Sequence, residues 1–214
     1  MQTMKGGLII ISSPSGGGKG TLIREVLRTT PGITFSVSYT TRAMREGEQN
    51  GREYIFVSRA EFEELINKGE FLEYAEVHGN LYGTSRTQIQ QVMDSGTDVL
   101  LEIDVQGARI LNSAAPDAIS IFILPPSFPV LQTRLTLRAT ESSGDLQLRL
   151  KNSFEEVRAY DLFKYVIVND DLNHAVEDLR TIIKAERLLR DRQIDEIQSI
   201  LDGFDASYRR FAAS

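Results

Sequence analysis

A glycine-rich stretch near the N-terminus has the residue types and spacing of a phosphate-binding loop. Residues 13–20 read S-P-S-G-G-G-K-G, close to the pattern G-x-x-x-x-G-K-[ST]. Gly16, Gly17 and Gly18 allow backbone N–H groups to converge on an anion at the start of the following helix, and Lys19 adds a positive charge. We therefore expect the phosphates of a nucleoside triphosphate to bind here. The alternative is a glycine-rich turn without a ligand.

Two positions depart from this pattern. Ser13 stands where the first glycine is expected, and Gly20 stands where Ser or Thr is expected. The hydroxyl group after the lysine commonly helps to hold Mg²⁺, directly or through water. Gly20 therefore leaves the metal ligands open, with Thr21 and carboxylates elsewhere in the chain as the alternatives.

Two arginines, Arg42 and Arg45, stand three residues apart in a polar stretch. Their planar guanidinium groups could clamp one phosphate, a role that lysine fills less well. Tyr54 is close enough in sequence to add a hydroxyl donor. An isolated pair of this kind is otherwise a solvated surface pair.

Carboxylates form a third set of candidates. Glu102 and Asp104 end an apolar run, where they could orient Mg²⁺ and its waters opposite the phosphate loop. Their alternative roles are a cap at the end of the strand or an internal salt bridge. Glu73 stands near Tyr82 and Thr84 in sequence, and taken alone it would be a solvated charge on a strand.

The elements that must position these residues alternate along the chain. Apolar runs at 8–12, 33–38, 98–104, 118–124 and 165–169 are typical of strands that are buried on both faces of a parallel sheet. Helices are predicted at 19–29, at 59–68 with a capping box from Ser58 to Glu61, and at 85–94. The pattern predicts an α/β fold with ligands at the carboxyl ends of the strands.

Three further regions stand out. Residues 37–87 are polar, with strand signals of their own, and read as an inserted subdomain. Residues 134–151 hold three arginines around a Ser-Ser-Gly centre and read as a mobile flap between two helical pieces. The last forty residues are charged and predicted to be helical, with one buried face formed by Val176, Leu179, Ile182, Ile183 and Leu188. They could form a helix packed on the core or a subunit contact.

Composition excludes several classes of protein. The 214 residues include no cysteine and only two histidines, which rules out disulfide scaffolds, thiolate zinc sites and histidine-rich metal sites. The net charge of −6 argues against bulk nucleic-acid binding. The first apolar stretch, residues 8–11, is too short for a signal peptide or a membrane span. We expect a cytoplasmic protein with neither nucleic acid nor membrane as a partner, and the oligomeric state stays open.

Taken together, several strings at family spacing resemble the guanylate kinases, P-loop nucleoside monophosphate kinases of purine nucleotide metabolism. They are IISSPSGGGKGTLI, FSVSYTTRAMREGEQNGREYIFVS, FLEYAEVHGNLYGTS, LEIDVQGA, RLTLRAT and YVIVNDDL. The resemblance implies transfer of the γ-phosphate of ATP to GMP or dGMP, giving ADP and GDP, with Mg²⁺ as cofactor. It implies one guanylate-kinase-like domain over 1–214, with a five-stranded parallel core (about 1–36, 88–130 and 152–214), a GMP-binding subdomain (about 37–87) and a lid (about 131–151).

The resemblance also assigns residues to the two substrates. Those implied around the GMP phosphate and sugar are Ser38, Arg42, Arg45, Tyr54 and Tyr82, and those implied at the guanine are Glu73, Thr84 and Asp104. Those implied around ATP are Ser15, Gly16, Gly17, Gly18, Lys19, Gly20, Thr21, Arg134, Arg138 and Asn169. Those implied as catalytic are Lys19, Arg42, Arg138 and Arg149, while Glu102 and Asp104 would reach the metal through water.

The chain departs from the family pattern at Gly20, at Ala139 in RAT where RGT is usual, and at Glu102 where Asp is common. The G-K-G-T loop of adenylate kinases, which are active enzymes, also has glycine after the lysine. Two other functions remain possible at this level. One is a non-catalytic module that uses the GMP site for phosphorylated peptides, as in scaffold proteins, which typically have an eroded phosphate loop. The other is a related kinase that acts on a ribose phosphate and does not need the residues that read the base.

Overall fold

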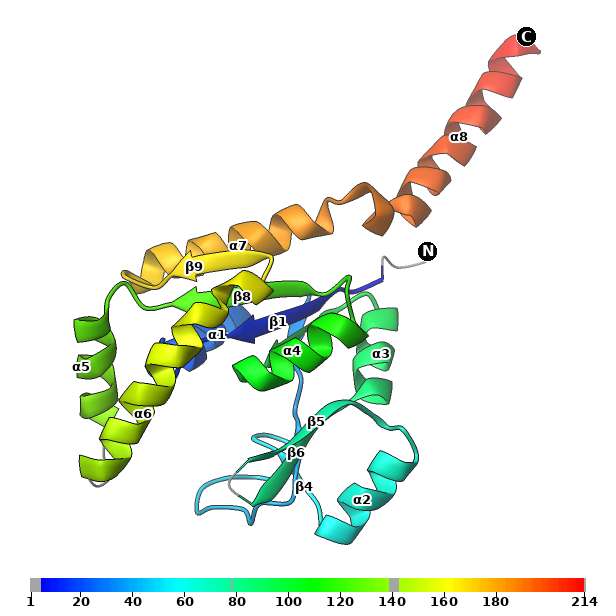
Figure 1. The fold of residues 1–214 in the computed structure, drawn as a ribbon. Coiled ribbons are helices and arrows are strands. Elements are labelled where there is room, and N and C mark those ends of the chain that lie inside the picture. The colour runs from blue at the N-terminus through cyan, green and yellow to red at the C-terminus, as the bar shows by residue number, and fades with distance from the viewer. Residues whose placement is uncertain (1–4, 78, 139–142, 214) are drawn as a thin grey trace.

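The computed structural model describes residues 5–77, 79–138 and 143–213 (Figure 1). Its centre is a sheet with the strand order β2-β7-β1-β8-β9, in which every pair of neighbours is parallel. The strands are β1 (Leu8–Ser12), β2 (Ile33–Phe35), β7 (Asp98–Glu102), β8 (Ile119–Leu124) and β9 (Tyr165–Val168). This confirms the predicted five-stranded parallel sheet. Two strands are clearly shorter than predicted. β2 ends at Phe35 because the chain then leaves to enter a second sheet, and β7 ends at Glu102 because Asp104 is already the N-cap of the following helix.

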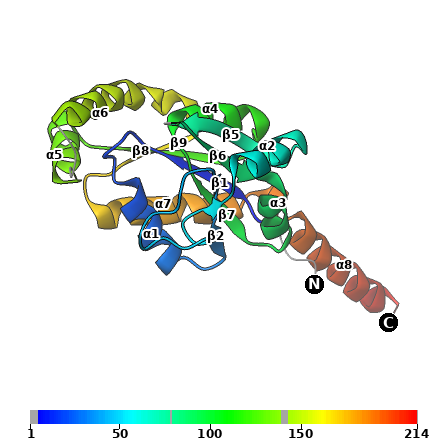
Figure 2. The same ribbon diagram turned by 90° about the horizontal axis from the view of Figure 1, so that it is seen from below.

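Helices cover both faces of the central sheet (Figures 1 and 2). One face packs against α1 (Lys19–Thr29) and α7 (Leu172–Arg187) through Leu22, Val26, Leu179 and other apolar side chains. The other face packs against α3 (Arg86–Asp94), α4 (Val105–Ala114) and the short helix η1 (Val157–Leu162). Because both faces are covered, the strands carry the nearly continuous Ile, Leu and Val runs seen in the sequence.

Residues between β2 and α3 build the second sheet, with the order β4-β3-β6-β5. Its elements are β3 (Tyr39–Thr40), β4 (Ile55–Phe56), α2 (Arg59–Asn67), β5 (Phe71–Val77) and β6 (Asn80–Ser85). The predicted capping box is confirmed: Ser58 accepts the backbone N–H of Glu61, and the carboxylate of Glu61 accepts that of Ser58. Phe62 from α2 stacks on Phe71 from β5, which gives this sheet a small core of its own.

Two helices form an arm beside the central sheet, α5 (Phe128–Arg138) and α6 (Ser143–Glu156) (Figure 1). At the base of the arm, Leu131 and Leu135 of α5 are buried. The base of the arm is therefore packed through buried apolar side chains. None of the helices within the described residues is long and apolar enough to cross a membrane.

The C-terminal region differs from the prediction. Leu179 and Ile183 of α7 are buried, as expected, and Val176 and Ile182 pack beside them. Leu188 is 71% exposed, so its predicted place on the buried face is wrong. It is the C-cap of α7, where the chain turns into η2 (Arg190–Arg192) and then into α8 (Ile194–Ala212), which extends away from the body of the molecule (Figures 1 and 2).

Candidate functional site

The phosphate loop joins the carboxyl end of β1 to the start of α1. Gly16 and Gly18 have positive φ angles of 82° and 90°, a conformation that glycine adopts without strain. Gly18 is the N-cap of α1, and no described side chain caps the helix. The backbone N–H groups of the first turn are therefore available to an anion at the positive end of the helix dipole.

Neighbouring segments leave no room for a side chain at Gly16 or Gly18. A Cβ atom on Gly18 would lie 2.3 Å from Nδ2 of Asn169, and one on Gly16 would lie 2.9 Å from Leu131 and Leu135 of α5. The buried Asn169 also donates a hydrogen bond from Nδ2 to the carbonyl of Gly17, at 2.8 Å. The residue that follows β9 thus fixes the shape of the loop that follows β1.

Lys19 is largely buried and points along the carboxyl ends of the strands. Its Nζ donates to the backbone carbonyl of Ile103 at 3.0 Å and lies 3.6 Å from Oε1 of Glu102. Burial is the largest influence and lowers the pKa of Lys19, while the negative charges of Glu102 and Asp104 act in the opposite direction. The ammonium group is therefore already aimed at the space between the phosphate loop and the end of β7.

The tip of the loop is bound to the end of α6. The backbone N–H of Ser15 donates to Oε2 of Glu156 at 3.0 Å, and the buried hydroxyl of Ser153 donates to the carbonyl of Ser15 at 3.1 Å. Two hydrogen bonds thus connect the arm to the phosphate loop.

Between the two sheets lies a cavity of about 270 Å³, which we call the Glu73 cavity. Its lining brings together residues from the second sheet and from the end of β7: Ser38, Tyr54, Glu73, Ala75, Tyr82, Gly83, Glu102, Ile103, Asp104 and Gly107. Glu73 comes from β5 of the second sheet, and Asp104 follows β7 of the central sheet. The cavity opens close to Lys19, since Glu102 and Ile103 belong to its wall and also contact that lysine.

Glu73 places a buried carboxylate in the wall of this cavity. The buried hydroxyl of Thr84 donates to Oε1 of Glu73 at 2.6 Å across the β5–β6 pair. Burial raises the pKa of Glu73, the hydrogen bond from Thr84 acts against this, and the nearby charge of Asp104 raises the pKa further. A buried carboxylate that faces a cavity is a strong acceptor for a ligand that carries adjacent N–H groups.

Arg42 is held in place just after β3 of the second sheet. Its guanidinium group donates to Oε1 of Glu48 at 2.7 Å and lies over the rings of Tyr54 and Phe56. The other carboxylate oxygen of Glu48 accepts the backbone N–H of Arg45, at 2.8 Å, and the side chain of Arg45 is exposed. The two arginines thus share one acidic partner.

The aromatic side chains beside Arg42 continue into the cavity wall. The rings of Tyr54 and Tyr82 meet edge to face, with 5.7 Å between their centroids. Burial is the main cause that raises the pKa of Tyr54, so its hydroxyl stays a proton donor at neutral pH.

A second cavity, of about 360 Å³, lies on the other side of the phosphate loop; we call it the Arg134 cavity. It is lined by Gly18, Thr21, Arg134, Leu137, Asn169, Asp170 and Leu172. Arg134 donates from one guanidinium nitrogen to the carbonyl of Asn169 at 2.9 Å, while its buried NH1 has no hydrogen-bond partner among the described residues. A buried donor of this kind is satisfied when an anion or a polar ligand enters the cavity.

The other two arginines of the arm are Arg138 and Arg149, and Arg149 lines neither of the two cavities. Arg149 lies in α6 and is part of the described structure. Arg138 is the last residue of α5, and its side chain falls outside the described part of the molecule, as does Ala139.

The candidate metal residues do not form a complete protein cage. Within the described residues, no three His, Asp or Glu side chains gather as a metal-binding group. Oδ1 of Asp104 accepts the backbone N–H of Gly107 as the N-cap of α4, and Glu102 is paired with Lys19. Space is open where a side chain on Gly20 would begin. These residues fit a metal ion that takes most of its ligands from phosphate and water.

Sequence reasoning missed the residues that hold the candidate site residues in place. Glu48 lies six residues after Arg42, in an acidic stretch where its charge could have suggested a partner. Ser153 and Glu156 follow the phosphate loop by more than 130 residues, and no local pattern indicates their contact with Ser15.

Comparisons with known proteins agree on one family. The family model described as guanylate kinase matches residues 5–186. A guanylate kinase of Neisseria meningitidis is 51% identical over 198 residues, covering 92% of this chain and 97% of that protein. One of Aliivibrio fischeri is 48% identical over 200 residues, with the same coverage. The crystal structure of guanylate kinase from Anaplasma phagocytophilum is similar with a TM-score of 0.71, at 35% identity over 89% of this chain and 91% of that one.

Proposed function

The chain belongs to the guanylate kinase family, enzymes that transfer the γ-phosphate of ATP to GMP, and on this premise we propose which of its residues bind the two substrates. GMP occupies the Glu73 cavity, and ATP lies across the phosphate loop and the Arg134 cavity. The observation that carries this proposal is the buried pair of Glu73 and Thr84, which faces Asp104 in a cavity beside Lys19.

Guanine recognition follows from the chemistry of Glu73. The N1–H and 2-amino groups of guanine form two adjacent donors that one carboxylate can accept together, whereas adenine has an unprotonated N1 and no 2-amino group there. AMP would leave the buried carboxylate unpaired. Sites of this kind reject analogues that lack the donors by a factor of about 10⁴ to 10⁵. Thr84 and Asp104 complete the set that reads the base.

Arg42 and Arg45 bind the GMP phosphate in this proposal, with Ser38, Tyr54 and Tyr82 on the phosphate and sugar side. The contact between Arg42 and Glu48 holds the guanidinium group ready before substrate arrives, so less side-chain freedom is lost on binding. The phosphate then competes with Glu48 for the same donors.

The donor phosphates bind to the amides of residues 15–21, and Lys19 reaches the phosphoryl group in transfer. Arg134, Arg138 and Arg149 belong to a lid at about 131–151, which closes on ATP over a core formed by about 1–36, 88–130 and 152–214. Asn169 shapes the adenine side, and residues of about 37–87 form the GMP-binding subdomain. The reaction needs no protein nucleophile, because positioning and charge neutralisation carry phosphoryl transfer.

Mg²⁺ is proposed to enter with ATP. Glu102 and Asp104 would hold the ion through water, Thr21 would lie near the β- and γ-phosphates, and the ion would supply positive charge to them. Gly20 contributes no ligand. The predicted cytoplasmic location and the absence of nucleic-acid partners stay predictions.

An acceptor panel tests the proposed site. ATP-dependent ADP release is measured with GMP, dGMP, AMP, CMP and UMP for the wild type, Glu73→Gln and Glu70→Gln. Glu70 is the matched control, because its carboxylate also bridges β5 and β6, through Ser85, but lies outside the Glu73 cavity. We expect Glu73→Gln to lower kcat/KM for GMP roughly 100-fold, since two hydrogen bonds to a charged group are weakened. Glu70→Gln should leave the preference for guanine unchanged.

Three outcomes would contradict the proposal. Equal turnover of AMP and GMP by the wild type would remove guanine recognition. Unchanged selectivity in Glu73→Gln would remove this role from Glu73. The absence of acceptor-dependent turnover would favour a non-catalytic binding module.

A further inference from the structure

Gly107, in the wall of the Glu73 cavity, is a glycine that the local backbone does not require. It lies buried in the first turn of α4, directly beside the cavity. Its φ angle is not positive, and its N–H donates to Oδ1 of the N-cap Asp104 at 2.7 Å, as the N–H of alanine also could. Alanine favours a helix more than glycine does. The conformation of α4 therefore gives no reason for glycine at this position.

The packing of the protein around Gly107 gives no reason for glycine either. A Cβ atom at this position would lie 3.4 Å from Oδ1 of Asp104, 3.5 Å from Cβ of Ile103 and 3.6 Å from Oε2 of Glu73. All three are ordinary van der Waals distances. A methyl group would therefore displace no atom of the protein, and what it would occupy is space in the cavity.

Two other glycines among the described residues line the substrate cavities, and both are needed by their neighbours. A Cβ atom on Gly18 would lie 2.3 Å from the side chain of Asn169. One on Gly83 would lie 2.8 Å from the ring of Phe62. Of these three glycines, only Gly107 has neighbours that would accept a side chain.

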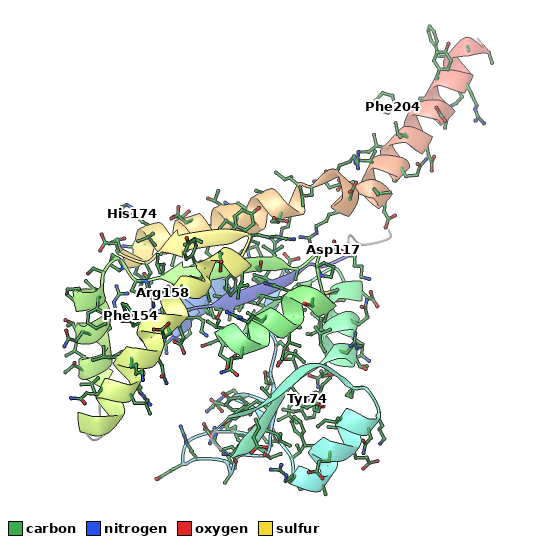
Figure 3. All side chains as sticks on the ribbon, in the orientation of Figure 1. Tyr74, Asp117, Phe154, Arg158, His174 and Phe204 are labelled. Atoms are coloured by element: carbon green, nitrogen blue, oxygen red, sulfur yellow. The ribbon has the colours of Figure 1, made fainter. Side chains whose placement is uncertain are left out.

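The course of β5 explains why Glu73 reaches α4. Tyr74 contacts Phe71 on the side of β5 that carries α2 (Figure 3). Because successive side chains of a strand point to opposite faces, Glu73 points to the other face. There α4 lies between β5 and the central sheet (Figure 1). Glu73 and Gly107 therefore face the same cavity.

The space beside Gly107 is next to a carboxylate oxygen without a partner. Thr84 donates to Oε1 of Glu73, while Oε2 accepts no hydrogen bond from the described residues. This Oε2 is the oxygen that a Cβ atom on Gly107 would touch, and Oδ1 of Asp104 would touch the same atom. A ligand donor placed here is thus close to both carboxylates.

We propose that Gly107 is a specificity-determining residue, whose missing side chain leaves room for the 2-amino group of guanine beside Glu73 and Asp104. This inference rests on the proposed binding of GMP in the Glu73 cavity. The 2-amino group carries two N–H donors, one next to N1–H for Glu73 and one that can reach Asp104. Hypoxanthine has the same N1–H but only a hydrogen atom in place of the amino group. Gly107 therefore favours GMP over IMP.

An added methyl group would compete with the 2-amino group for this space. A nitrogen that donates to Oε2 of Glu73 must approach to about 2.9 Å. A methyl carbon beside the same oxygen obstructs this approach, whereas the smaller hydrogen of hypoxanthine leaves more room. One extra methylene group in a binding pocket changes kcat/KM by about 10- to 200-fold. Gly107→Ala should therefore penalise GMP far more than IMP.

The test compares GMP and IMP as acceptors for the wild type, Gly107→Ala and Gly203→Ala. Gly203 is the matched control, because it also lies inside a helix, its Cβ would meet no atom within 4 Å, and it lines neither cavity. We expect Gly107→Ala to lower kcat/KM for GMP at least tenfold and for IMP less than about threefold. Gly203→Ala should change neither value.

Direct binding provides a second measurement that does not depend on turnover. Calorimetric titration of each nucleotide without ATP should show the dissociation constant of GMP raised at least tenfold in Gly107→Ala, and that of IMP nearly unchanged. KM for ATP should stay the same, because Gly107 lies outside the Arg134 cavity.

Thermal unfolding without nucleotides shows whether the protein itself needs this glycine. The Tm of Gly107→Ala should equal that of the wild type or exceed it by up to about 2–4 °C, since alanine favours the helix. A lower Tm would mean that the methyl group disturbs the protein, and it would overturn the inference.

The remaining outcomes separate this inference from the proposed function. Equal losses for GMP and IMP in Gly107→Ala, or no loss for GMP, would overturn the role of Gly107. Glu73→Gln is measured alongside: if it loses the preference for GMP over IMP while Gly107→Ala keeps it, only the role of Gly107 fails. If the wild type uses GMP and IMP equally well, the binding of guanine beside Glu73 fails first.

Discussion

At the scale of single residues, the buried carboxylate of Glu73 is the proposed acceptor for guanine, and its charge also lowers the stability of the folded protein. Its carboxylate is buried beside Asp104 and accepts a hydrogen bond from the hydroxyl group of Thr84. A raised pKa in the folded state means that the contribution of Glu73 to stability is fully present below its unfolded pKa and is lost as the pH rises through its folded pKa.

Glu73→Gln should therefore be more stable than the wild type at pH 8, by about 1 kcal/mol, because no buried charge remains. This corresponds to a rise in Tm of roughly 2–4 °C for a chain of this size. Thermal unfolding at pH 8 and at pH 5 without nucleotides measures the effect. The gain should be smaller at pH 5 than at pH 8, because burial raises the pKa of Glu73 and protonation therefore begins at a higher pH than for a free carboxyl group; a gain that does not depend on pH would contradict the burial of a charge as its cause.

Gly18, the N-cap of α1, and Gly20, in the first turn of α1, differ in their tolerance to substitution. A Cβ on Gly20 meets no atom within 4 Å, while Gly18 has a φ of 90° and its Cβ would overlap Asn169. Gly20→Ala should raise the stability by up to about 1 kcal/mol, as expected for replacing a glycine inside a helix. Gly18→Ala should lower both Tm and kcat/KM for ATP.

Gly20→Ser adds the hydroxyl group that the usual loop pattern contains. We expect the Mg²⁺ concentration for half-maximal rate to fall in Gly20→Ser and to stay at the wild-type value in Gly20→Ala. Titration of Mg²⁺ at fixed ATP measures both. Equal values in the two variants would show that the added hydroxyl does not join the metal shell.

At the scale of elements, the C-terminal end of α6, one of the two helices of the arm, is hydrogen-bonded to the phosphate loop. Glu156 and Ser153, one turn of helix apart, bind the N–H and the carbonyl of the same residue, Ser15. Movement of the arm therefore acts directly on the backbone amides that are proposed to hold ATP.

Glu156→Gln should raise KM for ATP by about three- to tenfold, because a hydrogen bond from Ser15 to a charged acceptor becomes one to a neutral acceptor. KM for GMP should stay the same. Glu155→Gln is the matched control, since Glu155 is exposed and pairs with Arg158 on the surface. Steady-state kinetics with each substrate varied in turn separates the two constants, and equal changes in both would contradict a role in shaping the loop.

Helices and strands could be predicted from the sequence where neighbouring residues determine them. Apolar runs and the capping box at Ser58 indicated the central strands and α2, because burial on both faces and cap hydrogen bonds leave a local pattern. The early end of β2 had no such pattern, since the chain leaves for another sheet. The exposure of Leu188 followed from where α7 ends, and periodicity alone continued the buried face past that point.

The residues of the candidate site also fall into those that a sequence motif indicated and those whose contacts only the structure shows. Sequence motifs pointed to Lys19, Glu73 and Thr84, which the structure sets along one edge of the fold. The resemblance also implied Asn169 around ATP, but no local pattern indicates its hydrogen bond to Gly17 or the contact of Glu156 with Ser15, because both come from segments far along the chain.

At the scale of the whole molecule, Asp98 at the start of β7 is hydrogen-bonded to the segment before β1 and to the segment that joins α7 to α8. Its buried carboxylate accepts hydrogen bonds from Arg192 and from the N–H of Gly7, both at 2.6 Å, and from Arg187 at 2.7 Å. Burial acts to raise the pKa of Asp98, but these hydrogen bonds outweigh it and the pKa is lowered. The first strand, β7 and the junction of α7 with α8 thus meet at one carboxylate.

Asp98→Asn should lower the stability at pH 7 by about 3 kcal/mol, since removing one member of a buried ionic group leaves its partners uncompensated. Tm should fall by about 6–12 °C. Because the folded pKa is lowered, this stabilisation is present above the unfolded pKa of about 3.9 and is lost as the pH falls through the folded value.

Chemical denaturation of the wild type and Asp98→Asn at pH 7 and pH 3 measures the difference, which should narrow at pH 3. Asp94→Asn is the control: Asp94 pairs with Lys5 at the surface, and its loss should change stability by less than about 1 kcal/mol. Equal effects of the two substitutions would contradict the role of Asp98 as an anchor.

The contact between Asn169 and the phosphate loop has a consequence for how this sequence can change over generations. Asn169 lies 152 residues after Gly17, yet its amide fills the space that any side chain at position 18 would need. A lineage that replaced Asn169 with a smaller residue would free that space and would also lose the hydrogen bond to the carbonyl of Gly17. Substitutions at positions 18 and 169 should therefore show strong epistasis, so selection acts on these two distant codons as a pair.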